Sequence, residues 1–293
     1  MIRTMFIGYD NRLNHCVARR IAQESTMVGS VWLTADARWH RSWRGRRDFL
    51  LKRLRRRGLL KAMDEIAYYA LHHATDKRSR NTLAANRLVD DYWEALVGDA
   101  SDTGASLGAV DVNDASVLEF VAKLKPDVIF AHCLNQFFGK RLRSATKHGI
   151  FMWHVGITPE YKGLYSPFWT MYNRDFENFG YSLIHLTDDL DAGAVYAQGR
   201  IDNVDVRRDN HVLIEHKAIL ASLDELGTFL RGLESGRLDP IVRPDAVEGY
   251  YSYPGLTDYL VQRWRVRAGK APGNVSATRS STTANRRAIS KAE

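Results

Sequence analysis

The chain has 293 residues, of which 45% are hydrophobic and 26% charged, the balance of an ordinary globular protein. The formal net charge of +8 is unevenly spread. Residues 38–61 hold eleven Lys or Arg and one Asp, and residues 263–293 hold eight Lys or Arg and one Glu. The rest of the chain is therefore acidic, which disfavours a protein that binds nucleic acid over its whole surface.

The number of cysteines and the length of the apolar runs indicate where in the cell the protein is expected. Two cysteines, Cys16 and Cys133, are too few for a disulfide framework and favour a reduced, cytoplasmic chain. No apolar run approaches the roughly 18 residues of a membrane span. The first residues lack the long apolar stretch of a signal peptide. We therefore expect a cytoplasmic protein.

Short apolar runs alternate with segments of helical periodicity along most of the chain. Helical spacing follows the first strand and recurs later, and it predicts helices over residues 115–124, 139–146 and 209–234. Buried strands are predicted over residues 4–9, 27–33, 128–131, 150–153, 181–186 and 194–198. Strands alternating with helices indicate an α/β fold with a mainly parallel sheet.

A basic helical insert separates the second strand from the helix at 115–124. It covers about residues 38–107 and includes a Leu-, Arg- and Lys-rich stretch, 46–74, with one or two helices joined near Gly58. Residues 81–97 continue it as a helix, and the Gly-, Ser- and Asp-rich residues 98–107 are expected to form a loop.

We expect three regions in chain order. Residues 1–204 form the α/β domain with its insert, and residues 205–268 form a mostly helical C-terminal extension. Residues 269–293 are rich in Ser, Thr, Asn and Arg and nearly devoid of large apolar side chains, which predicts a disordered tail.

Several common motifs are absent from the sequence. It contains neither Gly-x-Gly-x-x-Gly nor Gly-x-x-x-x-Gly-Lys, so a nicotinamide or nucleoside-triphosphate enzyme of the usual kind is unsupported. No Cys and His spacing fits a zinc site, because the adjacent pair His72 and His73 diverges on a helix. No metal is expected.

The stretch 149–198 contains the residues with the clearest chemical potential. His154 follows a buried strand, and Asp191 follows another in a turn with Gly193. Ligands of open α/β sheets bind at the carboxyl ends of the strands, so His154 and Asp191 are candidates for a proton-handling pair. A loop histidine bonded to a backbone carbonyl and a plain turn aspartate explain the residues equally well.

The same stretch resembles the folate-dependent formyltransferase superfamily. That family carries Asn-x-His-x-Ser-Leu-Leu-Pro-x-Tyr-x-Gly, followed by Gly-x-x-x-x-His and Leu-Asp-x-Gly. Matching positions in this chain are His154, Pro159, Tyr161, Gly163, Gly180, His185, Leu190, Asp191 and Gly193. The resemblance extends more weakly over residues 1–200 outside the insert and implies a Rossmann-like sheet.

The resemblance also implies a reaction and a set of site residues. In the family, an amine attacks the formyl carbon of 10-formyltetrahydrofolate, Asn and His stabilise the oxyanion, and Asp assists proton transfer. His154 and Asp191 take the catalytic positions here. Gly156, Pro159, Tyr161 and Gly163 form the substrate loop, and the positions implied to bind the folate are His132, Leu134, Asn135, Thr187, Asp188 and Asp189.

One position departs from the family motif. Met152 stands where the family has Asn, and a thioether donates no hydrogen bond. Losing one oxyanion donor typically costs roughly 10²–10³ in turnover. Three explanations stay open: Asn135 or a backbone N–H replaces the donor, the chain performs a different one-carbon or acyl transfer, or it binds ligands and catalyses little.

The acceptor amine is inferred from the C-terminal part. Residues 250–259, a Tyr-rich strand leading through Pro254 into a helix, resemble formyltransferase-like proteins of surface-glycan synthesis. An amino sugar on a nucleotide or lipid carrier is the expected acceptor. The basic residues 38–74 are interpreted as a solvated arm, a peripheral membrane face or an RNA-binding surface, the last being the least favoured.

Overall fold

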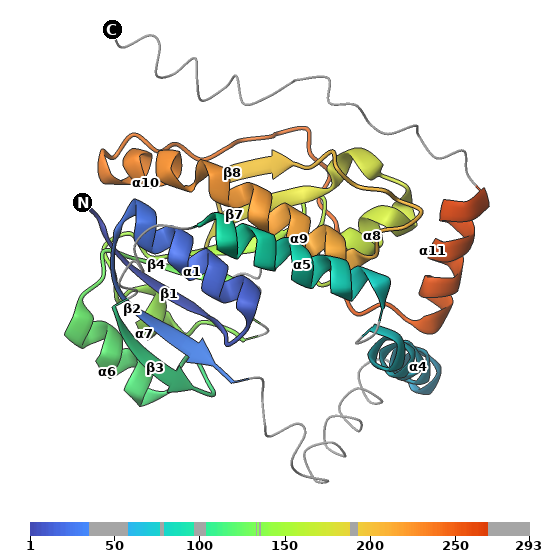
Figure 1. The fold of residues 1–293 in the computed structure, drawn as a ribbon, viewed down its shortest axis with the longest axis horizontal. Coiled ribbons are helices and arrows are strands. Elements are labelled where there is room, and N and C mark those ends of the chain that lie inside the picture. The colour runs from blue at the N-terminus through green and yellow to red at the C-terminus, as the bar shows by residue number, and fades with distance from the viewer. Residues whose placement is uncertain are drawn as a thin grey trace, which may run out of the picture.

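A computed structural model describes residues 1–34, 58–76, 79–96, 104–132, 134, 136–187 and 193–268. Its centre is a seven-stranded sheet in the order β3-β2-β1-β4-β5-β7-β8 (Figure 1). The strands are β1 (Arg3–Tyr9), β2 (Thr26–Leu33), β3 (Ala105–Ala109), β4 (Val128–His132), β5 (Ile150–Val155), β7 (Gly180–His185) and β8 (Val195–Arg200).

The sheet is mainly parallel, as the sequence predicts. Neighbouring strands from β3 to β5 run parallel, whereas β7 pairs antiparallel with both β5 and β8. The strand order reverses between β1 and β4, and such a reversal opens a crevice at the carboxyl ends of the two strands. The predicted α/β, Rossmann-like fold is confirmed.

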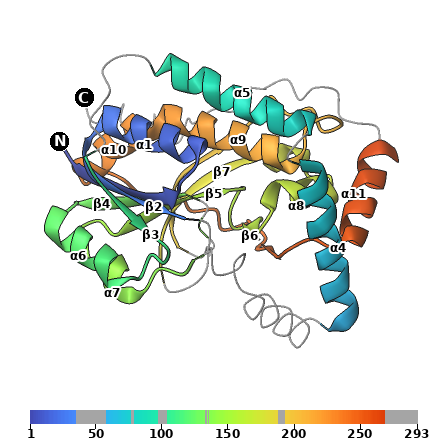
Figure 2. The same ribbon diagram turned by 60° about the horizontal axis from the view of Figure 1, so that its bottom comes forward.

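Helices cover both faces of the sheet (Figure 2). One face packs on α1 (Arg12–Glu24), α9 (His211–Ser222) and α10 (Leu226–Glu234), and the other on α6 (Ala115–Leu124) and the short α7 (Lys140–Arg143). Strand side chains alternate between these layers: Phe130 and Trp153 enter the first core, and Ile129 and Met152 the second.

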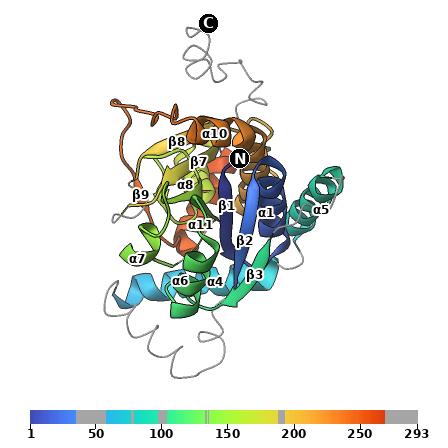
Figure 3. The same ribbon diagram turned by 90° about the vertical axis from the view of Figure 1, so that its left-hand side faces the viewer.

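The insert supplies two further helices. The described part of the stretch 46–74 is helical from Leu59, as α4 (Leu59–Asp76), directly after Gly58. The next helix, α5 (Arg80–Ala95), lies outside α1 and α9 (Figure 3). Residues 35–57 of the basic segment and the tail 269–293 lie outside the described residues.

A third group of elements closes one end of the sheet. It consists of α4, α8 (Ser166–Asn173) and α11 (Leu256–Ala268), which pack side by side, and the two-stranded pair β6 (Lys162–Gly163) and β9 (Tyr250–Tyr251). Two single 3₁₀ turns, Phe176–Asn178 and Leu223–Glu225, complete the described elements.

Three sequence predictions differ from the structure. The expected loop at 98–107 contains the start of edge strand β3, whose Ala, Ser and Gly residues carry no strand signal of their own. The single helix expected over 209–234 is broken into α9 and α10 by the turn Leu223–Glu225. The helix expected over 139–146 is shorter, ending at Arg143. No described helix is long and apolar enough to cross a bilayer.

Candidate active site

The candidate site starts at β5, next to the centre of the sheet. His154 lies at its carboxyl end, 7% exposed, and pairs across the sheet with Ser182 of β7. Because side chains alternate along a strand, His154 shares a face with Met152, while Trp153 and Val155 enter the opposite core. The strand thus places a histidine where a ligand of an α/β sheet binds.

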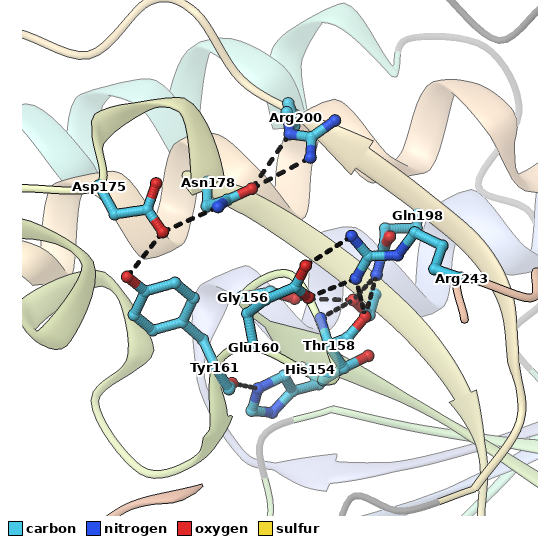
Figure 4. A network of polar contacts seen from close by, with 11 residues as sticks. His154, Gly156, Thr158, Glu160, Tyr161, Asp175, Asn178, Gln198, Arg200 and Arg243 are labelled. Atoms are coloured by element: carbon cyan, nitrogen blue, oxygen red, sulfur yellow. Dashed lines mark hydrogen bonds and ion pairs between the residues drawn. The ribbon is translucent and has the colours of Figure 1, made fainter. Parts of the chain in front are cut away.

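A backbone carbonyl fixes the ring of His154 (Figure 4). Nε2 lies 2.6 Å from the carbonyl oxygen of Tyr161, and the Ser166 hydroxyl oxygen lies 3.2 Å from the same nitrogen. A carbonyl only accepts, so Nε2 donates and carries the proton. The neutral ring then has its lone pair on Nδ1, which is the nitrogen able to take up a proton.

The loop after His154 is held by hydrogen bonds from β7 and β8. The Ser182 hydroxyl donates to the carbonyl of Gly156 at 2.7 Å and accepts from the backbone N–H of Thr158 at 3.1 Å. From β8, Gln198 Nε2 donates to the Thr158 carbonyl at 2.9 Å. All three bonds are partly or fully buried, so they hold the loop firmly against β7 and β8.

The far side of the loop is tied to more distant parts of the chain (Figure 4). Arg243 forms a two-pronged ion pair with Glu160, one prong at 2.8 Å, and also donates to the Thr158 carbonyl. The Tyr161 hydroxyl donates to Asp175 at 2.9 Å. Burial raises the pKa of Tyr161 above its ordinary value, so this hydroxyl stays protonated. The carbonyl that holds His154 is therefore firmly placed.

His154 lies on a cavity of about 670 Å³ with two unlike walls. One wall is mostly apolar and comes from the loop after β4 and from β5 and β7. The other is polar and aromatic and comes from the loop around α8, from α9 and from the Tyr-rich segment. The first wall includes Leu134, Phe137, Phe138, Met152 and Leu186, and the second Tyr165, Ser166, His211, Glu215 and Tyr253.

The structure brings some of the predicted site residues together. Leu134, Thr187 and Gly163 line the cavity with His154. Gly156, Pro159 and Tyr161 belong to the loop behind the histidine. The remaining predicted positions except His132, namely Asn135, Asp188, Asp189 and Asp191, lie outside the described residues.

His132 occupies a second cavity, of about 510 Å³. Its Nδ1 lies 2.5 Å from Asn14 Oδ1, and Asn14 Nδ2 donates to the Tyr9 carbonyl, so the Asn14 oxygen accepts and Nδ1 carries the proton. Nε2 is buried without a hydrogen-bond partner within the described chain. Burial lowers the pKa of His132 to about 3, so the ring is neutral at pH 7. Glu215 lines both cavities, which therefore adjoin.

Sequence reasoning missed the residues that fix the loop. Ser182 and Glu160 fall inside the matched stretch and could have been noticed there. Arg243, Gln198 and Glu215 are brought in from distant elements, and no local pattern marks them. As for metals, the described ranges contain no cluster of three or more His, Cys, Asp or Glu side chains able to hold an ion.

Comparison with known proteins bears on this arrangement. The chain is 27% identical over 127 residues to a methionyl-tRNA formyltransferase of Thermotoga neapolitana. That match covers 43% of the chain and 40% of the relative's length. No family model matches the chain.

Solved structures of formyltransferases share the fold. A sugar N-formyltransferase from a Shewanella species aligns with a TM-score of 0.50 at 9% identity, covering 91% of this chain and 88% of its own. A glycinamide ribonucleotide transformylase from Symbiobacterium toebii aligns at 0.51 and 12% identity, covering 86% and 95%. The resemblance carried by the motif around His154 is thereby confirmed, and the chain is similar in sequence and in fold to the formyltransferase superfamily.

Proposed function

We propose that the protein transfers a formyl group from 10-formyltetrahydrofolate to a primary amine, in the first place that of an amino sugar. The observation that carries this proposal is the position of His154. It stands at the carboxyl end of β5 with its tautomer fixed, between an apolar and a polar wall of one cavity. The similarity to a formyltransferase sequence and the shared fold support the same reaction.

The apolar wall fits a folate. Phe138 is buried, Phe137 is 58% exposed, and both belong with Leu134 and Leu186 to one side of the cavity. Flat heteroaromatic rings bind between such side chains, and a cavity of about 670 Å³ accommodates a ligand of this size. We therefore assign this wall to the formyl donor, with Leu134 and Thr187 among the contacting residues. Asn135, Asp188 and Asp189 keep their proposed place in the same site.

The chemistry of His154 follows from its hydrogen bonds. Because Nε2–H is committed to the Tyr161 carbonyl, proton exchange takes place at Nδ1. The protonated ring donates from Nδ1 to the negative charge that develops on the formyl oxygen as the amine attacks. Asp191 balances the charge of the imidazolium and accepts a proton from the attacking amine. Asp191 then passes this proton to the folate nitrogen as the bond from that nitrogen to the formyl carbon breaks, and His154 keeps its Nδ1 proton, so the site ends in its starting protonation state.

The polar wall supports an amino-sugar acceptor. Glu215, His211 and Tyr253 lie opposite the apolar wall and can hydrogen-bond sugar hydroxyls. A protein named as a sugar N-formyltransferase is among the structures with the same fold. Gly156, Pro159, Tyr161 and Gly163 then shape the acceptor side of His154.

The direct test is a transfer assay on the full chain. We expect the wild type to release tetrahydrofolate from 10-formyltetrahydrofolate when a suitable amino-sugar nucleotide is added, and not without it. His154→Ala and Asp191→Asn should each lower the rate by about 10²-fold or more. Transfer that is unchanged in both variants would refute the assignment. His148→Gln, at the opposite end of β5, is the matched control.

A second candidate function rests on Met152. The side chain lines the cavity beside His154, 8% exposed, and its thioether cannot donate to an oxyanion. This favours a ligand-binding homologue with little turnover. Such a protein binds a folate analogue and an amino sugar but transfers no formyl group.

The basic segment concerns location rather than chemistry. Most of it lies outside the described residues, but α4 follows it with Leu59, Leu60 and Met63 at 62%, 84% and 58% exposure. Exposed apolar side chains beside a basic run suit a peripheral contact with an anionic membrane. Salt-sensitive sedimentation with anionic vesicles, compared with a tRNA gel shift, separates this function from RNA binding.

A further inference from the structure

A third cavity, of about 550 Å³, is lined by four arginines and is here called the arginine cavity. It lies among α4, α8, α11 and the turn before α9. Its basic residues are Arg207, Arg208, Arg263 and Arg267. His72 and His211 line both this cavity and the active-site cavity, so the two spaces adjoin.

The arginine cavity has a net positive charge. Its one acidic residue, Asp209, is paired with the ammonium group of Lys217 at 2.7 Å. Arg208 has only Asp205, at 3.6 Å and largely in solvent, a pair of little strength. For the side chains of the other three arginines, the described chain offers no carboxylate partner at all.

Hydrogen bonds hold this cationic rim in place. The backbone N–H groups of Arg208 and Asp209 both donate to the Asp205 carbonyl, at 3.0 and 2.7 Å, which closes a tight turn. Asn81 of α5 donates from Nδ2 to the Arg208 carbonyl at 3.0 Å and ties the turn to that helix. The guanidinium group of Arg263 lies 5.9 Å from the ring centre of Tyr259. The turn thus holds Arg207 and Arg208 in place, and the ring of Tyr259 holds Arg263.

Two further features favour an anion in this space. The N-terminal caps of α5 and α9, Ser79 and Asn210, line the cavity, so the positive ends of both helix dipoles lie at it. His211, a side chain able to donate a hydrogen bond, is only 9% exposed and lines the same cavity.

A solvated surface is the alternative explanation of exposed arginines. It does not account for their gathering around one hollow, nor for the pairing of the one acidic residue there, Asp209, with Lys217. Guanidinium groups match the geometry of phosphate oxygens with paired hydrogen bonds, and four of them suit a doubly charged group better than a carboxylate.

We infer that the arginine cavity binds the phosphate or diphosphate group of the amine acceptor. The sugar would then pass His211 and Tyr165, whose ring centres lie 5.3 Å apart, and present its amine at His154. This assignment rests on the proposed formyl transfer and names the chemical class of the acceptor. The phosphate belongs to a nucleoside diphosphate or to a lipid phosphate, which share the same recognised group.

Calorimetry on the full chain tests the inference. Inorganic pyrophosphate is titrated into wild type, into the double variant Arg207→Ala/Arg263→Ala and into Arg237→Ala. Arg237 is an exposed arginine just beyond α10, whose side chain makes no hydrogen bond or ion pair within the described structure, and it serves as the matched control. We expect wild type and control to bind alike, and the double variant to bind at least about tenfold more weakly. Equal binding by all three proteins, or no binding by wild type, would overturn the inference.

Two further titrations separate this result from the formyl-transfer proposal. A folate analogue should bind wild type and the double variant equally, because the arginines lie outside the apolar wall. If the wild type binds no folate analogue, the proposed reaction is contradicted, whether or not the wild type binds pyrophosphate. A nucleoside diphosphate sugar and a short-chain polyprenyl phosphate sugar in micelles then decide the source. The one that competes with pyrophosphate carries the recognised phosphate.

Discussion

His154 owes its orientation to the backbone carbonyl of Tyr161, with the Ser166 hydroxyl beside the same ring nitrogen. The Tyr161 carbonyl accepts from Nε2 at 2.6 Å, and that carbonyl is placed by a loop bonded to Ser182, Gln198 and Arg243. A histidine bonded to a carbonyl is also the plainest structural interpretation of such a residue. The structural and the catalytic interpretation of His154 are compatible. The hydrogen bond from Nε2 to the Tyr161 carbonyl satisfies the ring and at the same time leaves Nδ1 as the nitrogen for catalysis.

Replacing Met152 tests the departure from the family motif. If another group already supplies the oxyanion donor, Met152→Asn leaves turnover within the same order of magnitude. If the donor is missing, the new amide raises turnover by roughly 10²–10³. We expect the first result, measured as initial rates of tetrahydrofolate release.

The control for this prediction is Met152→Leu, which keeps the apolar contact and donates nothing. Burying an amide at this 8%-exposed position costs about 1–3 kcal/mol, so unfolding curves of both variants should accompany the rates. A large gain in Met152→Asn alone would favour the ligand-binding homologue over the active enzyme.

The sequence identifies His154 for a physical reason. A histidine that ends a short apolar run and is followed by Gly and Pro is expected at the carboxyl end of a strand. His154 lies there, at the end of β5. His132 follows a similar strand and points into the second cavity. A shift of the strand by one residue turns a side chain at its end to the other face of the sheet, and so to the other cavity. The sequence alone does not fix that position.

At the scale of elements, the substrate loop depends on a pair of two-residue strands. Gly163 of β6 has φ of +92° and pairs with Tyr251 of β9. A Cβ at Gly163 would lie 2.1 Å from the Tyr251 carbonyl oxygen. No side chain fits there without breaking the pairing.

Gly163→Ala should therefore lower the unfolding free energy by about 1–3 kcal/mol and reduce formyl transfer, because the loop that holds His154 loosens. Gly108→Ala in β3 is the control, since a Cβ there meets nothing within 4 Å. Denaturant unfolding of both variants measures the difference. Equal stability would mean that β6 and β9 contribute little to the loop.

Elements with their own signal were predictable, and those defined by contacts were not. Helix α6 was predicted at its observed bounds, because its apolar residues fall at helical spacing and Lys125-Pro126 ends it. Strand β3 was missed since parallel pairing with β2 creates it. The break between α9 and α10 was also missed, because the apolar spacing runs on through the turn.

At the scale of the whole molecule, buried histidines make stability depend on pH. Burial lowers the pKa of both His132 and His211 from 6.5 to about 3. Between these values the unfolded chain binds protons that the folded chain refuses, so the folded state loses stability as pH falls through 6.5. Each histidine contributes at most about 1.4 kcal/mol per pH unit.

We therefore expect the unfolding free energy of wild type to fall between pH 7 and pH 4.5, measured by denaturant titration at each pH. His132→Gln should show a shallower fall, because one of the histidines whose pKa is lowered by burial no longer titrates. Parallel slopes for wild type and His132→Gln would contradict the assignment of His132 as buried and neutral.

The charge distribution also makes sense only for the whole chain. The +8 net charge comes from two basic segments, while the α/β body is acidic. Arg263 and Arg267 of the second basic segment join Arg207 and Arg208 of the body at the arginine cavity beside the active site. The basic residues before α4 lie outside the described residues, and for them we propose the contact with an anionic membrane. The net charge of +8 thus combines two separate groups of basic residues, one proposed for acceptor recognition and the other for location.

Folate binding at the apolar wall beside His154 underlies the whole proposed reaction, and calorimetric titration of the full chain with 5-formyltetrahydrofolate measures it. We expect one bound molecule per chain. We also expect that Leu134→Asp, which puts a charge into the apolar wall, weakens binding by about tenfold or more, while Arg237→Ala leaves it unchanged. Absence of binding in wild type, or equal binding by Leu134→Asp, would contradict folate binding at this wall.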